Sequence, residues 1–242
     1  MQYFRDFKTL LYRFGNEFDP VAFQDISKYG DVIDQIKDNV TFFNFHTIQE
    51  GLRPDQVSIQ LYQTPLYYWT FYLLNDDIRE QGWPLTNGEL QVYTQKIFPN
   101  TVINTRENIS AKFKVGQTVT GGSSGASGKI IRRNLNLGQI VVEGIQGFRT
   151  SGELFQSTSS AGVVESLTAF SSAKEYLAAS HYIDGNQKLV DIDPFSAPGA
   201  SFTEKTNEDV YYDINESLKT IKIIKPSLMG TLISSYRKTI RE

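Results

Sequence analysis

The sequence predicts an α+β protein in which one part of the chain mixes strands with helices and another holds only short strands. Three stretches carry this prediction. Residues 43–83 join an aromatic, β-branched run to two apolar stripes at helical spacing. Residues 113–155 alternate Gly- and Ser-rich turns with β-branched runs. Residues 218–240 combine an Ile/Lys alternation, typical of a strand, with the stripe of a terminal helix.

The stretch from Phe43 to Trp83 is expected to form a strand followed by two helices. Its aromatic and β-branched start, residues 43–48, suits a strand that Gly51 ends. Pro54 and Asp55 open the first helix, because proline fits the first helical turn and an early carboxylate complements the helix dipole.

The second helix of this stretch has a clear beginning and end. Thr64 can cap it and Pro65 fits its first position, while Asn75 and the two aspartates after it tolerate turn conformations. Its apolar stripe consists of Leu66, Trp69 and Leu73. We expect Trp69 to be a core residue.

A third helix and a strand are expected to complete this part of the chain, residues 43–109. Thr86 and Glu89 match the capping-box pattern, and Pro99 ends the helix that they begin. The following strand is predicted at Thr101–Ile103 and would complete this part of the chain.

Residues 110–170 are predicted to be an inserted small all-β domain, a barrel or twisted sheet of short antiparallel strands. Within it, GGSSGASGK at residues 121–129 raises the alternative of a phosphate loop. That alternative is disfavoured, because the spacing and the Lys-Ser/Thr ending of a P-loop are missing and no helix pattern follows. A hairpin tip is the preferred interpretation.

Residues 171–242 are expected to contain a hairpin around Asp184-Gly185-Asn186, a linker at 193–204, a strand at 218–225 and a helix after Pro226. His181, with Asp191 and Asp193 nearby, allows a metal or acid–base site. The simpler interpretation is an exposed hairpin with solvated carboxylates, because nothing else completes a ligand set.

The N-terminal region, residues 1–42, combines an apolar arm with a helix near Val32–Val40. Large apolar side chains crowd the arm: Tyr3, Phe4, Phe7, Leu10, Leu11, Tyr12, Phe14 and Phe18. Two interpretations stay open. The arm packs on its own domain, as apolar groups usually do, or it docks on a neighbouring subunit.

Composition argues against several function classes. The chain has 24 Lys and Arg against 27 Asp and Glu, so nothing favours nucleic acid binding. It has no Cys and only two His, which argues against disulfides, thiolate metal sites and a His-based active site. Its charged first residues and the lack of a long apolar run predict a protein without signal peptide or membrane span, used inside the cell that makes it.

The centre of the chain resembles a LysM module, and more closely the LysM-like baseplate wedge subunit of T-even-type contractile-tailed phages. In that family a Gly-x-Arg-Pro-Asp turn precedes a Leu-Tyr pair and a Tyr-Tyr-Trp helix ending in Leu-Leu-Asn. The matching residues here are Gly51, Arg53, Pro54, Asp55, Leu61, Tyr62, Tyr67, Tyr68, Trp69, Leu73, Leu74 and Asn75. The aromatic opening and the Ile-Lys-Ile-Ile-Lys-Pro string before the last helix also match.

The resemblance implies a LysM-like β-α-α-β module with extended aromatic terminal arms, no enzymatic activity and no cofactor. It implies a structural subunit of the virion tail baseplate, bound to other wedge proteins in a hetero-oligomeric, six-fold assembly, without nucleic acid or membrane partners. The candidate interface residues are Tyr3, Phe4, Phe7, Tyr12, Phe14, Arg53, Tyr67, Tyr68, Tyr236 and Arg237. The alternative is a LysM-type module that binds peptidoglycan or another glycan in a groove between residues 51–55 and 76–82.

Overall fold

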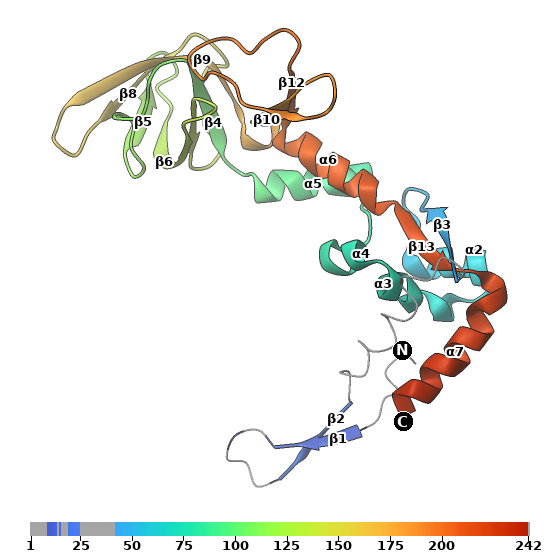
Figure 1. Ribbon diagram of the computed structural model, residues 1–242. Helices are drawn as coiled ribbons and strands as arrows, with labels where there is room; N and C mark the ends of the chain where they lie inside the picture. The colour runs from blue at the N-terminus through green and yellow to red at the C-terminus, as the bar shows by residue number, and fades with distance from the viewer. Residues whose placement is uncertain (1–8, 14, 16–18, 25–41, 242) are drawn as a thin grey trace. The chain divides into compact units, whose positions relative to one another are not determined.

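The computed structural model describes residues 9–13, 15, 19–24 and 42–241, and the backbone alone at 235–236 and 239–241. It contains both helices and strands (Figure 1), so the α+β prediction is confirmed. The chain divides into two compact units. Unit 1 comprises Met1–Thr86 and Asn215–Glu242, and unit 2 comprises Asn87–Ile214. The predicted helix near Val32–Val40 lies outside the described residues.

Unit 1 is a two-stranded antiparallel sheet with helices from both of its chain segments. The sheet pairs β3 (Phe43–Thr47) with β13 (Thr220–Ile224). The helical elements are α2 (Pro54–Tyr62), the single 3-10 turn η2 (Pro65–Tyr67), α3 (Trp69–Leu74), α4 (Asp76–Gln81) and α7 (Pro226–Arg241). A separate hairpin, β1 (Thr9–Tyr12) with β2 (Val21–Gln24), comes from the N-terminal region.

The strand that pairs with β3 is β13, so the prediction that a strand at Thr101–Ile103 completes this part of the chain is wrong. Residues Thr101–Thr105 form β4, which pairs with strands of unit 2 instead. Consecutive elements usually lie side by side, and this pairing across unit 2 is an exception to that tendency. The sheet of unit 1 is therefore completed only after the chain has passed through unit 2.

Strand β13 is buried because both of its faces are covered. Ile221 and Ile223 join one cluster with Val57, Phe71 and Ile78 from the helices. Ile224 points to the other face and joins a second cluster with Leu74 of α3 and with Met229, Leu232 and Ile233 of α7. Burial of each such side chain contributes about 1.5–3 kcal/mol, so these two clusters make up the core of unit 1.

Two asparagine side chains form hydrogen bonds between the two chain segments of unit 1. Asn75 accepts from the Lys222 N–H at 2.7 Å and donates to the Lys222 carbonyl at 2.9 Å, on the outer edge of β13. Asn215 repeats this arrangement with Leu85, at 2.8 and 3.0 Å. Each side-chain amide thus makes the two backbone hydrogen bonds that a neighbouring strand would make. Together the two asparagines join the two segments of unit 1.

The second predicted helix is divided at Tyr68 into η2 and α3. Thr64 caps the first turn as expected, since its hydroxyl accepts from the Leu66 N–H at 3.3 Å. The 3-10 geometry of that turn moves Leu66 off the predicted stripe, and its side chain is exposed. Leu73 is buried as predicted, whereas Trp69 is only partly buried against the α7 cluster.

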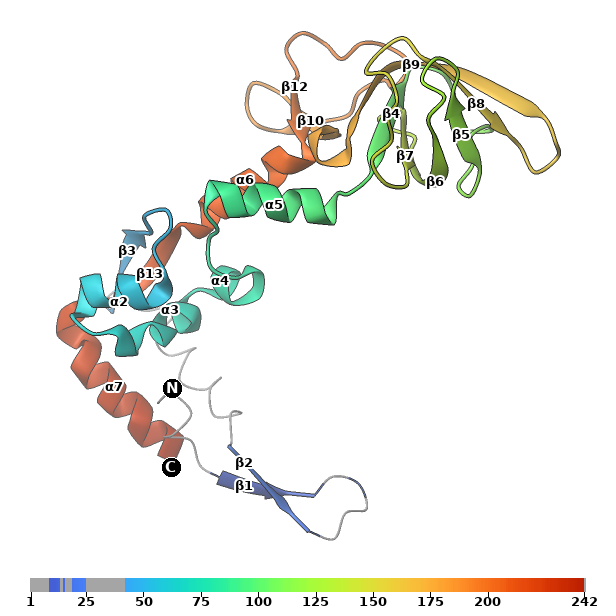
Figure 2. The same ribbon diagram turned by 180° about the vertical axis from the view of Figure 1, so that it is seen from behind.

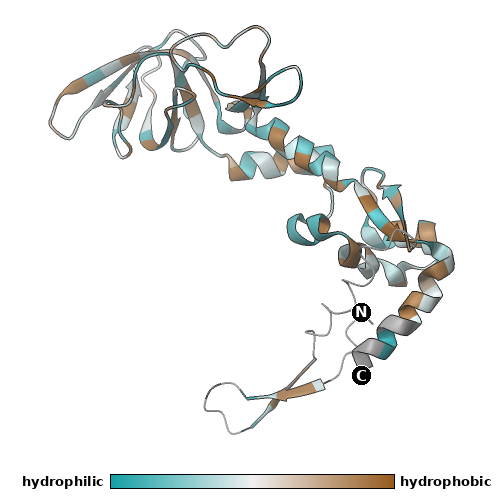
Figure 3. Cartoon of the chain, viewed as in Figure 1, coloured by the Kyte–Doolittle hydropathy of each residue, from teal (hydrophilic) through white to brown (hydrophobic). Residues whose placement is uncertain are grey.

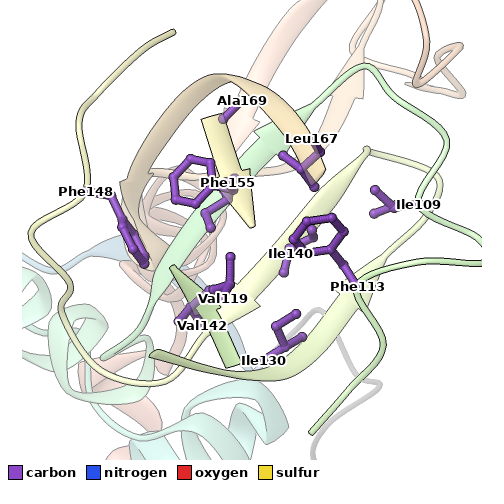
Figure 4. Close-up of a cluster of buried hydrophobic side chains, with 11 residues drawn as sticks. Ile109, Phe113, Val119, Ile130, Ile140, Val142, Phe148, Phe155, Leu167 and Ala169 are labelled. Atoms are coloured by element: carbon purple, nitrogen blue, oxygen red, sulfur yellow. The ribbon is translucent and has the colours of Figure 1, made fainter. Parts of the chain in front are cut away.

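Unit 2 is built on a closed antiparallel barrel with the strand order β4-β7-β6-β5-β8-β9 (Figure 2). Its strands are β4, β5 (Thr118–Gly121), β6 (Ser127–Asn134), β7 (Gln139–Val142), β8 (Leu154–Thr158) and β9 (Val164–Lys174). Figure 4 shows apolar side chains filling the interior, among them Phe113, Ile130, Ile140, Phe155 and Leu167. All five are buried, so the barrel has a core of its own.

The predicted insertion at residues 110–170 is too short at both ends. The barrel also needs β4, which lies before residue 110, and the end of β9, which continues to Lys174. Closure explains this extension, because β4 bridges β7 and β9 and an open barrel would leave two unpaired edges.

The rest of unit 2 contains helices α5 (Asn87–Ile97) and α6 (Asn207–Leu218), whose last turn belongs to unit 1, and a small sheet. The predicted hairpin is confirmed as β10 (Ala179–Ile183) paired with β11 (Leu189–Val190). The predicted linker is not free of secondary structure, since it ends in β12 (Thr203–Thr206), the other neighbour of β10. Glu175, in the 3-10 turn η3 (Glu175–Leu177), accepts from the Asn100 side chain at 2.6 Å.

A buried carboxylate organises the GGSSGASGK loop, which joins β5 to β6 as the predicted hairpin tip. The fully buried Glu153 accepts from the backbone N–H groups of Ser123, Ser124 and Arg149 at 3.1, 2.6 and 2.8 Å. A Cβ at Gly121 would lie 2.5 Å from this carboxylate, so only glycine fits there. Loop amides that could bind phosphate therefore bind a side chain of the same chain.

Replacing Glu153 with glutamine should weaken unit 2 and flatten its response to acid. Burial alone raises the pKa of Glu153, but the hydrogen bonds from Ser124, Arg149 and Ser123 outweigh burial and bring the pKa below its usual 4.5. The stabilisation is thus complete above about pH 4.5 and lost as the pH falls through the lowered pKa. We expect Glu153→Gln to cost about 1–3 kcal/mol at pH 7, measured by urea unfolding.

The matched control for this experiment is the exposed Glu143, changed to glutamine. Its unfolding free energy should follow the parent protein at every pH. Equal acid sensitivity of the Glu153→Gln variant and the parent would contradict the assigned role of the carboxylate.

Unit 1 should fold without unit 2. The hydrogen bonds between Leu85 and the Asn215 side chain hold the two ends of residues 87–214 close together. A linker of about four Gly and Ser residues can therefore join Thr86 to Asn215 at little cost in loop closure. We expect this shortened protein to unfold cooperatively on heating, followed by circular dichroism. A gradual, non-cooperative transition would show that unit 1 depends on unit 2.

Candidate interaction surfaces

The turn between β3 and α2 carries the most specific residues of the predicted motif. Gly51 adopts φ +80°, which favours glycine, and Pro54 is the first residue of α2. The exposed Arg53 guanidinium pairs with Asp55 through two hydrogen bonds of 2.7 and 3.1 Å. The hydrogen bond from Arg53 also lowers the pKa of Asp55 below its usual value. The candidate Arg53 is thus at the surface and held in place by its neighbour.

Trp83 lies against this turn. Its indole N–H donates to the Leu52 carbonyl at 2.7 Å, and its ring centroid is 6.0 Å from Phe71 and 6.1 Å from Tyr72. The expected glycan groove runs between residues 51–55 and 76–82. Trp83 binds a backbone carbonyl of the first of these segments, so a ligand there would compete with the protein's own side chain.

The candidates Tyr67 and Tyr68 are half-buried and contribute to the core of unit 1. Tyr67 packs edge-on against Tyr62, with ring centroids 6.0 Å apart, and belongs to the α7 cluster. Tyr68 packs on the cluster around Phe71. Tyr62 donates to the Ile224 carbonyl at 2.9 Å, and burial raises its pKa above the usual value. Only the outer parts of Tyr67 and Tyr68 can contact another protein.

The β1–β2 hairpin presents apolar side chains on both of its faces. Leu10 and Phe23 are cross-strand partners on one face, and Leu11, 71% exposed, faces the other way beside Ala22. Tyr12 lies opposite Val21, and both are exposed as well. Figure 3 shows the apolar colour along β1. The other candidates of this region, Tyr3, Phe4, Phe7 and Phe14, lie outside the described residues.

The C-terminal candidates lie on α7, which packs against Leu74 and Ile224 of unit 1 through Met229, Leu232 and Ile233. This contact corrects the prediction of an extended C-terminal arm, because the apolar stripe of the helix covers its own core. Arg237 is exposed, and the side chain of Tyr236 lies outside the described part.

Strand β3 adds an exposed aromatic residue that the motif did not single out. In the described part of the chain, β13 is the one strand paired with β3. Phe45 is 69% exposed on this strand, whereas Phe43 is buried under the Lys222 ammonium group, 5.0 Å from the ring centre. Phe43 and Phe45 are two residues apart on one strand and share a face, so alternation in the sequence could not show which of the two would be covered.

The described residues bring together no group of three or more His, Asp or Glu side chains that could hold a metal ion. His181 lies on β10 near Ser180, and Asp193 accepts from the Phe195 N–H within its own loop. His46 is partly buried, and burial lowers its pKa, so it is neutral at pH 7. Across the described ranges, no helix is long and apolar enough to cross a membrane.

Comparison of the sequence with models of known protein families finds no match, and comparison with curated proteins finds none.

The Trp83 contact predicts a measurable loss of stability. Phenylalanine keeps an aromatic ring beside Phe71 but removes the N–H that binds the Leu52 carbonyl, so Trp83→Phe should cost about 1 kcal/mol. Trp83→Ala also removes the ring and should cost roughly 3 kcal/mol. Both values are measured by chemical unfolding. Equal stability of the two variants would contradict the packing of this ring.

Proposed function

We propose that this protein is a structural subunit of a contractile-tailed phage baseplate, a wedge component that joins neighbouring subunits. The observation that carries the proposal is the β1–β2 hairpin. A two-stranded hairpin is marginally stable by itself in water, and this one exposes Leu10, Leu11, Tyr12, Val21 and Phe23. Apolar side chains gathered on a small element are typical of a surface that another protein covers.

The residues that carry the resemblance to the wedge family support the proposal through their structural roles. Gly51 makes the left-handed turn, Pro54 begins α2, and Asn75 binds the edge of β13. Unit 1 places β3, the helices α2, α3 and α4, and then β13 in this order, and we propose that this part corresponds to a LysM-like module. These three motif residues thus shape a turn, a helix start and a strand edge of unit 1, which supports the proposal.

The alternative of glycan binding in the LysM-like groove has less support. Trp83 already donates to the Leu52 carbonyl beside that groove. A module that uses its shape to hold other proteins does not need the groove open, whereas a glycan-binding module does. Fold similarity by itself does not decide between these functions.

The proposed partners are other wedge proteins in a hetero-oligomeric, six-fold assembly, and the proposed location is the virion tail baseplate. No cofactor, nucleic acid or membrane takes part in the proposed role. Cryo-electron microscopy of purified tailed particles from the source of this sequence tests it directly. Density for the chain in a six-fold baseplate would support the role, and absence of the protein from purified particles would refute it.

A hairpin variant should separate assembly from folding. Changing Leu10 and Leu11 to serine removes apolar surface that is already exposed to water, so the unfolding free energy should change by less than about 0.5 kcal/mol. Incorporation into baseplates, followed by complementation and particle purification, should be lost because docking would no longer bury this surface.

The matched control is Leu189→Ser on β11, an equally exposed leucine in unit 2. This variant should assemble like the parent protein. Normal incorporation of the Leu10/Leu11 double variant would contradict the role given to the hairpin.

A further inference from the structure

Strand β3 has one open edge. β13 pairs along one side of β3, and no other strand of the described ranges pairs along the other side. The hydrogen bond from the Ile48 N–H to the Lys219 carbonyl, 2.8 Å, shows which residues of β3 bond to β13, because hydrogen-bonded and non-hydrogen-bonded pairs alternate along an antiparallel ladder. The backbone N–H and C=O groups that point away from β13 therefore belong to Phe43, Phe45 and Thr47.

The opposite edge of the same sheet is closed by side chains. On β13, Asn75 binds both the N–H and the C=O of Lys222, and the Tyr62 hydroxyl donates to the Ile224 carbonyl at 2.9 Å. The outward backbone groups of β3 have no comparable partner in the part of the chain that the structure describes. Unit 1 thus satisfies one edge of its sheet and leaves the other open.

The open edge also lacks the features that usually protect an edge strand. Charged side chains, prolines and β-bulges keep exposed edges from pairing with other chains. The sequence of β3 is FNFHT, with no charged residue at pH 7 and no proline, and its register with β13 is continuous. Phe45, at the middle of the strand, is 69% exposed. An unprotected edge of this kind is complementary to another extended strand.

We infer that the β3 edges of two copies of this chain pair with each other, antiparallel about a two-fold axis at Phe45. An isologous contact pairs the same surface of both subunits. Phe45 would then exchange both of its backbone hydrogen bonds with Phe45 of the second copy, and Phe43 would do the same with Thr47 of the second copy. The sheet would become four-stranded, with β13 at each outer edge.

The side chains of β3 are compatible with this self-pairing. Aromatic residues directly opposite each other in an antiparallel pair attract, and like charges repel. The two-fold axis places Phe45 opposite Phe45 and brings no charged residues of the two β3 strands together. Because β13 already holds β3 in its extended conformation, little conformational entropy is lost on association.

The contact is short, so we expect a weak dimer that dissociates on dilution. This inference concerns the free protein and does not depend on the proposed baseplate role. The test is sedimentation velocity of the purified full-length protein over a wide range of concentrations, up to its solubility limit. The expected result is a monomer–dimer equilibrium.

Two variants test whether the β3 edge carries the dimer. Phe45→Lys places like charges at the two-fold axis and should abolish dimerisation. It should keep cooperative thermal unfolding, because the side chain is already exposed to water. Thr47→Pro removes an outward N–H, which an edge strand tolerates. By symmetry this variant loses two hydrogen bonds of the dimer, so dimerisation should weaken by up to about tenfold for each.

The matched control is Val92→Lys on α5, at a position 67% exposed, which should dimerise as the parent protein does. Amide exchange measured by NMR adds an independent readout. The amides of Phe45 and Thr47 should become protected as the concentration rises, whereas those of Asn44 and His46, which bond to β13, should be protected throughout.

Four results would overturn the inference. They are a monomer at every concentration, a dimer that Phe45→Lys leaves intact, equal loss of the dimer in Val92→Lys, and a dimer in which the Phe45 and Thr47 amides stay unprotected. The second result, if the change of Leu10 and Leu11 to serine removed the dimer, would assign self-association to the β1–β2 hairpin instead.

Discussion

The fold of unit 1 depends on joining two chain segments that lie on either side of unit 2. Asn75 and Asn215 do this with bidentate amide contacts to the backbone of Lys222 and Leu85. Closing a flexible loop of that length would cost entropy, although the cost grows slowly with length. Unit 2 folds on its own core, and its ends are held together at Leu85. The interruption therefore adds a second domain without opening the sheet on which the first depends.

Both units bury an apolar core and expose single apolar side chains. Unit 1 exposes apolar and aromatic side chains such as Leu11 and Phe45, and the proposed contacts with other proteins use those of the β1–β2 hairpin. Unit 2 fills a closed barrel with apolar side chains and also exposes others, such as Ile145 and Leu189. In unit 1, Trp83 binds the Leu52 carbonyl through its indole N–H and packs against Phe71 and Tyr72.

Local signals in the sequence predicted elements well, and long-range pairing poorly. Proline at position 54, the Thr64 cap and the turn at 184–186 each act over a few residues, and the structure contains all three features. The partner of β3 could not be predicted, because no local pattern marks a strand that returns after 172 residues, from Thr47 to Thr220. The buried Glu153 was missed because it looks like any surface glutamate.

The measurement that tests this account most directly is native-state hydrogen exchange of the whole protein, resolved by residue. If unit 1 is one fold interrupted by another, amides of β13 should exchange with the same opening free energy as those of β3 and α2. Amides of the barrel strands should share a second, different value. The account would be contradicted if β13 exchanged together with the barrel that precedes it in the sequence, or if it exchanged without protection while β3 stayed protected.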